Sequence, residues 1–441
     1  MRERAAMRRI VWIVTVIALC YSAAHFIQSG VIFPLRQANI AKFEEETPAL
    51  REHIRTGEPV HFGNPVQYGP VFFFVMHPLM VHTQGNLQQL SNGLYAIQLV
   101  CVSLALLVTF ASLKPLVRTE DWPLTAAWIV VLWMNFAPLY TIIGVKSVET
   151  WELLLISLAL YGYVQGRLWL LAIAIAAAAL VKVLPLIFFY YLLLTNRRAF
   201  AYACVALASI LVVSHLLYGP EMGILYLPTV ARAASGHSFG LLWHENLSVK
   251  ALIAKLIGHL DAPDVAAGRG GSTLHMTDSQ LRTAILLGNI AVGIGLALLT
   301  WVLIRPAQRT REQILWEWSL VTLAMLLLSP NTTFEYATLA LGAISYALVR
   351  AAGFGAPIEH RRRNWLTLGA AMFFLGVLLP RQLLNRLTFV ETFTRWSGYA
   401  HLTPSEAYQY YCLPLLGLVL LTAAIWQIQP RLPRPAIPVS P

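Results

Sequence analysis

Apolar blocks long enough to cross a bilayer recur along this chain from residue 10 to residue 428. A helix needs about 20 mostly apolar residues to cross the hydrocarbon core of a membrane. Because only 12% of the residues are charged, against about a quarter in soluble domains, the chain is suited to lipid. We expect an all-α polytopic membrane protein with about 10–12 transmembrane helices. The predicted spans are residues 10–29, 91–112, 122–142, 148–165, 167–195, 199–217, 282–304, 313–329, 334–350, 364–381 and 407–428.

Two apolar blocks leave the topology open. Block 69–82 is short and holds two prolines, while block 167–195 is too long for one span and is interrupted between Lys182 and Pro185. In one reading, 69–82 lies on the outer surface and 167–195 is a pair of short helices. In the other reading both blocks cross once, which places Lys114, Arg118 and Arg167 outside. Because cytoplasmic loops carry the excess of Lys and Arg, the first reading is preferred, with both termini in the cytoplasm.

This topology predicts one integral membrane domain over residues 1–428. Its longest outer loops are 30–90 and 218–281, and a proline-rich cytoplasmic tail follows at 429–441. Within the first loop, EEETPALREHIR has the spacing of a helix lying on the membrane surface. The net charge of +11 comes from short basic clusters between apolar blocks, which argues against nucleic-acid binding. The four cysteines are far apart, so neither a disulfide framework nor a zinc site is expected.

Charged residues inside apolar blocks are candidates for function because lipid excludes them. Lys182 follows an alanine-rich run and precedes Pro185, where its ammonium could hold a phosphate or extend to the outer headgroups. Glu149 and Glu152 share one helix face with Lys146, which fits either a substrate contact or a structural ion-pair cluster. Glu335 stands in a predicted first helical turn, where it either acts on substrate or balances the helix dipole.

The outer loops hold further polar candidates. A carboxylate there could serve as a general base and an arginine could bind phosphate, although each of these residue types, taken singly, is more often a solvated loop residue. No glycine-rich phosphate loop is present, so a soluble nucleotide is not expected as substrate. The candidates are Glu44 to Glu46, His53, Arg55, Trp243, His244, Glu245, Asn246, Arg381 and Arg386.

Several motifs occur in an order that resembles glycosyltransferase family 87, the polyprenol-phosphate-mannose-dependent mannosyltransferases of the C-type glycosyltransferase superfamily. The first loop contains YGPVFFFVMHPL, and the stretch GRLWLLAIAIAAAALVKVLP combines a Gly-Arg turn with an alanine-rich helix ending in Lys-x-x-Pro. HENLSVKALI resembles the family's Asn-Gln-Ser loop, and SPNTTFEYATLAL resembles its Ser-Pro-x-Ser-Trp-x-His helix start. The similarity covers about residues 10 to 350.

The resemblance implies the C-type glycosyltransferase fold and an inverting transfer of a sugar, mannose first, from a polyprenyl-phosphate donor. The acceptor would be a lipid or glycan on the outer side of a bacterial inner (plasma) membrane, with no metal or other cofactor. The family's acidic residue falls on Lys42, so the base would be Glu44, Glu45 or Glu46, with Glu44 first, or Glu335 at the family's histidine position. The remaining expected roles are donor-phosphate binding by Lys182 and Arg55, and substrate binding by Tyr68, Glu149, Glu152, His244 and Asn246.

Two other functions stay open on the sequence alone. A transporter or flippase of a lipid-linked saccharide would also use intramembrane charges and broken helices, but it predicts inverted repeats, which we do not find in the sequence. A non-catalytic relative that serves as a scaffold for envelope assembly would explain why lysine replaces the family's acidic residue.

Overall fold

A computed structural model of the chain describes residues 2–36, 46–61, 68–235, 246–260, 274–304, 309–351, 358–375 and 412–430. These residues are helical apart from two short antiparallel strands, β1 (His259–Leu260) and β2 (Leu274–His275). The predicted all-α class is therefore confirmed for the part of the chain that is described.

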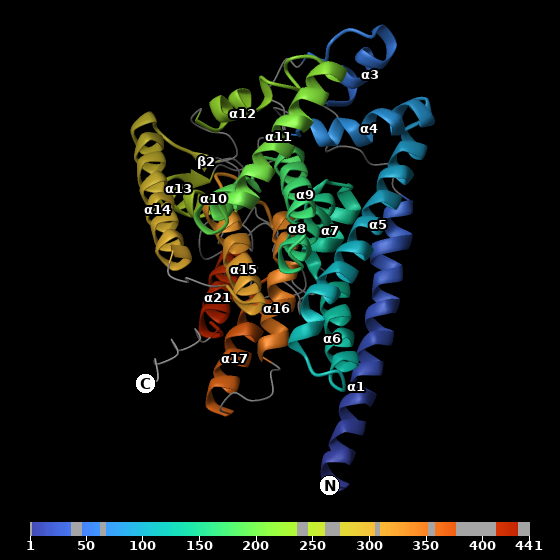
Figure 1. Cartoon of the computed structure of the whole chain (residues 1–441), viewed down its shortest axis with the longest axis vertical. Helices are drawn as coiled ribbons and strands as arrows, with labels where there is room; N and C mark the ends of the chain where they lie inside the picture. The colour runs from blue at the N-terminus through green and yellow to red at the C-terminus, as the bar shows by residue number, and fades with distance from the viewer. Residues whose placement is uncertain are drawn as a thin grey trace, which may run out of the picture.

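The helices alternate between long rods and short pieces (Figure 1). In chain order they are α1 (Arg2–Phe26), the π-helix η1 (Ile27–Ile32), α2 (Phe33–Leu35), α3 (Glu46–Thr56), α4 (Pro70–Thr83), α5 (Leu87–Leu113), the 3₁₀-helix η3 (Lys114–Leu116), α6 (Trp122–Met134), α7 (Ala137–Val145), α8 (Glu149–Val164), α9 (Leu168–Val181), α10 (Leu186–Thr195), α11 (Arg197–Tyr218), α12 (Tyr226–Ser235), α13 (Val249–Ile257), α14 (Asp278–Ile304), α15 (Arg311–Leu328), the 3₁₀-helix η5 (Phe334–Ala340), α16 (Leu341–Ala351), α17 (Ile358–Phe374) and α21 (Leu413–Gln427).

Four helical stretches among the described residues are long and apolar enough to cross a membrane: 9–35, 87–116, α11 and α14. A fifth is gained if α6 and α7, bent by 53°, count as one broken span. The multi-pass character is confirmed, but the expected 10–12 spans would have to include shorter or more polar helices. The physical reason is local. Proline opens α7 and stands just before α10, while α15 carries charged residues in its first two turns.

The two blocks with open topology form short helices. Block 167–195 divides into α9 and α10, with the break between Lys182 and Pro185, as the first reading expects. Helix α4 lies across one end of the bundle with α3 and α12, opposite the N-terminus (Figure 1). Helix α3 confirms the predicted helix in the first loop and turns Leu50 inward while Arg51 stays exposed. These three helices build the end at which the candidate site lies.

Segments predicted to share the cytoplasmic side meet at the other end of the bundle. Arg350 of α16 forms an ion pair with Glu312 of α15 at 2.7 Å. Arg311 donates to the Gln165 side chain, in the turn between α8 and α9, at 3.5 Å. The two contacts join three basic loops that the charge pattern alone assigned to one side.

A glycine in the first loop, Gly69, packs directly against the backbone at the break between α9 and α10. The Gly69 amide donates to the Val181 carbonyl at 2.9 Å, and a β-carbon at Gly69 would lie 2.1 Å from the Leu180 carbonyl oxygen. The neighbouring Tyr68 ring stacks on Phe72 at 4.9 Å, and Phe72 in turn stacks on Trp151 at 6.1 Å. Loop and break therefore form one packed unit.

Substituting Gly69 by alanine tests this packing. We expect Gly69→Ala to lower the free energy of unfolding by about 1–3 kcal/mol, because the added methyl meets backbone that cannot move away. Gly144→Ala in α7 is the control, since a β-carbon there meets nothing within 4 Å and alanine favours helix. The thermal unfolding midpoint in detergent measures both. Equal midpoints for the two variants would contradict the close packing of Gly69.

Candidate functional site

The site is organised around a lysine at the point where α9 ends. Lys182 adopts extended backbone after Val181, and only 8% of its surface is exposed. Its ammonium donates to Glu149 Oε1 at 2.5 Å and to the Tyr336 hydroxyl at 2.8 Å. Three distant elements, α8, the end of α9 and η5, therefore converge on one cation.

Aromatic rings enclose the same ammonium. Its nitrogen lies 4.4 Å from the centre of the Tyr336 ring and 5.1 Å from that of Tyr68. Such contacts contribute about 0.5–2 kcal/mol, most where water is excluded. The rings and the Glu149 carboxylate together offset the loss of hydration that a buried ammonium suffers.

Glu152 lies next to this ion pair. It shares the inner face of α8 with Glu149 at the i, i+3 spacing and lies within electrostatic range of both Glu149 and Lys182. The side chain is fully buried, yet neither carboxylate oxygen has a hydrogen-bond partner among the described residues. The sequence expected either a substrate contact or an ion-pair cluster with Lys146. The ion pair of Glu149 that the structure shows is with Lys182, and Lys146 is buried where α7 ends.

Tyr226 completes the cluster from the first residue of α12. Its hydroxyl is buried, lacks a hydrogen-bond partner within the described chain and lies within electrostatic range of Glu152 and Lys182. A β-carbon on Gly69 would come within 2.7 Å of that hydroxyl, so Tyr226 reaches the first loop. Sequence reasoning missed both Tyr226 and Tyr336. Tyr336 directly follows the flagged Glu335, whereas nothing near Tyr226 in the sequence signals its place.

Glu335 is half-buried on η5, beside the tyrosine that reaches Lys182. Its carboxylate accepts a hydrogen bond from the Thr333 hydroxyl. The expected base Glu335 is therefore the sequence neighbour of Tyr336, whose hydroxyl accepts a hydrogen bond from Lys182. Its role in catalysis stays a prediction.

Asn246 joins two loops behind the site. Its amide nitrogen donates to the Pro330 carbonyl at 2.9 Å, and its side-chain oxygen accepts from the Thr332 amide at 3.1 Å. Lys255 donates to its backbone carbonyl at 2.8 Å. These contacts hold the chain just before η5, so the geometry supports a positioning role, through Tyr336, for a residue that the sequence assigned to substrate.

Arg55 lies on the exposed side of α3, away from these contacts. It forms an ion pair with Glu52 at 2.5 Å, and this hydrogen bond is the main cause that holds the pKa of Glu52 below its usual value. Its neighbour His53 packs its ring against His77 and Tyr218 instead. Phosphate binding by Arg55 would use a side chain that already has a carboxylate partner.

Several expected site residues lie outside the described residues. They are Glu44, Glu45, Trp243, His244, Glu245, Arg381 and Arg386. In the parts of the chain that the structure describes, no group of three or more His, Cys, Asp or Glu side chains could hold a metal ion.

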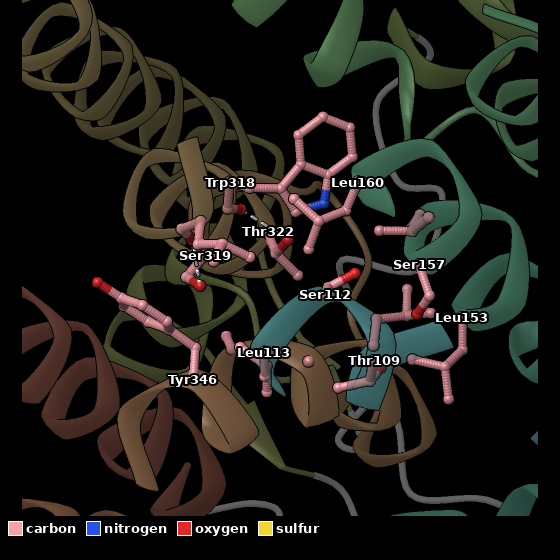
Figure 2. A pocket seen from close by; sticks show the side chains of 15 residues that line it. Thr109, Ser112, Leu113, Leu153, Ser157, Leu160, Trp318, Ser319, Thr322 and Tyr346 are labelled. Atoms are coloured by element: carbon pink, nitrogen blue, oxygen red, sulfur yellow. Dashed lines mark hydrogen bonds between the residues drawn. The ribbon is translucent and has the colours of Figure 1, made fainter. Parts of the chain in front are cut away.

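A second polar feature lies between α5, α8, α15 and α16, further along α8 from the lysine (Figure 2). It is a small cavity whose wall carries the hydroxyls of Thr109, Ser112, Ser157, Ser319 and Thr322. Three of them already donate to the backbone of their own helices, as Ser112 does to Val108 at 2.9 Å. No charged side chain lines this cavity, so we do not assign it to the reaction.

Comparison with known proteins identifies a family. A sequence model described as glycosyltransferase family 87 matches residues 67–330, more than half of the chain. A search of curated proteins gives no match. The matched segment contains Tyr68, Glu149, Glu152, Lys182 and Tyr226, so most of the cluster falls within it.

Breaking the ion pair tests whether the cluster depends on Lys182. We expect Lys182→Met to destabilise the protein by about 3–5 kcal/mol, because Glu149 would remain buried without its cation. The double variant Lys182→Met/Glu149→Leu should regain much of that loss.

The control for this comparison is Lys250→Met, since Lys250 donates to the neutral Asn289 side chain at 2.6 Å and leaves no orphaned charge. The measurement is denaturant-induced unfolding in mixed micelles. Additive losses in the double variant would show that the two side chains do not interact.

Proposed function

The chain belongs to glycosyltransferase family 87, and we propose that it transfers a sugar, mannose in the first instance, from a polyprenyl-phosphate donor to a lipid or glycan acceptor, with inversion. The observation that carries this proposal is the polar cluster around Lys182. It is buried among helices of a multi-pass protein, under helices that lie across one end of the bundle. A donor whose carrier dissolves in lipid and whose head is polar needs a site of this kind.

The chemistry that we propose breaks one bond and forms another. The acceptor hydroxyl attacks the anomeric carbon, a carboxylate takes its proton, and polyprenyl phosphate leaves with the electrons of the old C–O bond. Glu44 and Glu45 in the first loop, or Glu335 beside Tyr336, are the proposed bases. Recognition of one sugar and one acceptor over others would come from the contacts around them.

Lys182 is the residue that we propose to face the phosphate end of the donor. An ammonium has three hydrogens, and the contacts with Glu149 and Tyr336 use two of them. The described residues supply no acceptor for the third, which we propose donates to an oxygen of the ligand. Because Glu149 balances the charge of Lys182, this contact would orient the donor more than it would attract its charge. Arg55 would serve the phosphate only after leaving Glu52.

We further propose that the end formed by α3, α4 and α12 faces the outer side and that both termini lie in the cytoplasm of a bacterial cell, in its inner membrane. The basic loops that meet at the other end support this orientation.

Labelling of single cysteines tests the orientation. In a variant lacking the four native cysteines, His61→Cys on the first-loop end should react with a membrane-impermeant maleimide in intact cells. Arg118→Cys, in the loop after α5, should react only after the membrane is opened. Both side chains are well exposed, which makes them a matched pair. The reverse pattern would contradict the proposed orientation.

Transfer of radiolabelled mannose from synthetic polyprenyl-phosphate-mannose to a membrane lipid extract tests the activity. We expect turnover by the purified chain and a loss of at least about 100-fold in the variant that lacks the base, Glu44→Gln, Glu45→Gln or Glu335→Gln. Arg118→Gln is the control and should keep full activity, because it lies at the opposite end. No transfer from mannose or from any other polyprenyl-phosphate sugar would overturn the proposal.

A transporter of lipid-linked saccharides is the second candidate, favoured by the two broken helix pairs, α6 with α7 and α9 with α10. It predicts that the chain moves the labelled lipid across a vesicle membrane without releasing polyprenyl phosphate. Release of the carrier on transfer would exclude it.

A further inference from the structure

Two buried polar side chains beside Lys182, Glu152 and Tyr226, have no role in the proposed sugar transfer. Glu152 is fully buried and Tyr226 is 1% exposed, and both belong to the surroundings of the lysine. Neither the Glu152 oxygens nor the Tyr226 hydroxyl meets a hydrogen-bond partner in the described part of the chain. They come from α8 and α12, and the Tyr226 hydroxyl lies against Gly69 of the first loop.

The same protein shows how a buried glutamate is satisfied when it has only a structural role. Glu317 of α15 is as fully buried as Glu152. It accepts hydrogen bonds from Tyr191 at 2.9 Å, Arg309 at 2.9 Å and Gln313 at 3.1 Å. Burying a polar group without partners costs about 1–3 kcal/mol, and more if the group is charged. Glu152 and Tyr226 both have buried oxygens without a hydrogen-bond partner among the described residues, and this indicates a polar ligand.

Charge decides which kind of ligand fits. The pair of Lys182 and Glu149 is neutral in sum, and Glu152 adds either a negative charge or a protonated carboxyl. Glu152 itself would not attract an anion, so in this arrangement the phosphate faces Lys182 and a neutral group faces Glu152. Neutral hydroxyl groups suit it, because each one both donates and accepts hydrogen bonds. The Tyr68 ring, which stacks on Phe72 and lies 5.1 Å from the Lys182 nitrogen, borders the cluster on an apolar side.

We propose that Glu152 and Tyr226 form a hydroxyl-recognition subsite that binds the sugar of the donor next to Lys182. In this arrangement the two oxygens of Glu152 accept from sugar hydroxyls, and the Tyr226 hydroxyl donates to one. This inference rests on the proposed function, since it assigns the sugar end of the same donor. It makes the two residues determinants of sugar specificity, and neither takes part in breaking the glycosidic bond.

The closed geometry has a consequence for ligand entry. Glu152 is fully buried and Tyr226 is 1% exposed, so neighbouring elements must shift before a sugar can reach them. Because the Tyr226 hydroxyl lies against Gly69, a shift of α12 away from Gly69 is the opening that the subsite proposal implies. The hydrogen bonds gained by the orphaned groups would offset the cost of that shift.

The experiment compares donors that lack one hydroxyl. Transfer rates are measured with polyprenyl-phosphate-mannose and with its 2-, 3-, 4- and 6-deoxy forms, for the unaltered chain and for Glu152→Gln and Tyr226→Phe. For the complete donor, we expect each variant to lower kcat/KM by about 10- to 100-fold, as the loss of a hydrogen bond in a dry site does. For one deoxy form, the same substitution should have almost no further effect, because its partner is already missing.

Tyr346→Phe is the matched control. Tyr346 is also a buried tyrosine whose hydroxyl meets no partner in the described residues, but it lies on α16 in the wall of the small cavity that no charged side chain lines (Figure 2). It should leave the ratio of rates between donors unchanged. Equal losses for all donors in Glu152→Gln and Tyr226→Phe would overturn the subsite and leave a purely structural role.

A second readout separates this inference from the proposed function. The thermal unfolding midpoint is recorded with polyprenyl-phosphate-mannose, with its deoxy forms and with polyprenyl phosphate alone. The subsite predicts a larger upward shift with the complete donor than with bare polyprenyl phosphate, and the difference should vanish in Tyr226→Phe. If the complete donor gives this larger shift but no sugar is transferred, only the transferase reaction is refuted. Equal shifts for both lipids would refute the subsite even if transfer occurs.

Discussion

The ion pair between Lys182 and Glu149 is the interaction on which the rest of this structure depends. Either charge alone would be costly in a buried position of a membrane protein, and the pair is tolerable only because Tyr336 and Tyr68 enclose it. To reach Glu149, Lys182 must lie where α9 stops, so the pair also fixes the break before Pro185. The backbone that the break exposes then receives the amide of Gly69 from the first loop.

Two fully buried glutamates differ in their hydrogen bonding. Glu317 accepts from Arg309, Tyr191 and Gln313, which is what a structural network requires. Near Lys182, the oxygens of Glu152 and the hydroxyl of Tyr226 have no hydrogen-bond partner among the described residues. The two glutamates are equally buried, so the contrast between them lies in hydrogen bonding. The absence of partners beside an ion pair is what supports a ligand site at Glu152.

Much of this arrangement follows from the sequence, and the reasons for the rest are physical. Apolar block length and the placement of Lys182 before Pro185 predicted the helical class and the break, and the family match over residues 67–330 confirms the resemblance. The binding role of Lys182 stays a prediction. The partner of Lys182 was harder to predict. Glu149 and Lys146 are neighbours along one helix face, but Lys182 lies 33 residues further on and meets Glu149 only through the packing of α8 against α9. Tyr336 was marked only by its neighbour Glu335, and Tyr226 by nothing, because an aromatic residue in an apolar stretch is ordinary until a cation or a carboxylate is brought to it.

The most direct test of this account is a map of the protein in a lipid nanodisc with polyprenyl-phosphate-mannose bound. The account predicts the sugar between α8 and α12, with its hydroxyls within about 3.2 Å of Glu152 and Tyr226 and the phosphate on the Lys182 side. Helix α12 should be displaced from Gly69. A donor head bound elsewhere, with Glu152 and Tyr226 still in contact with protein or water alone, would contradict the central claim.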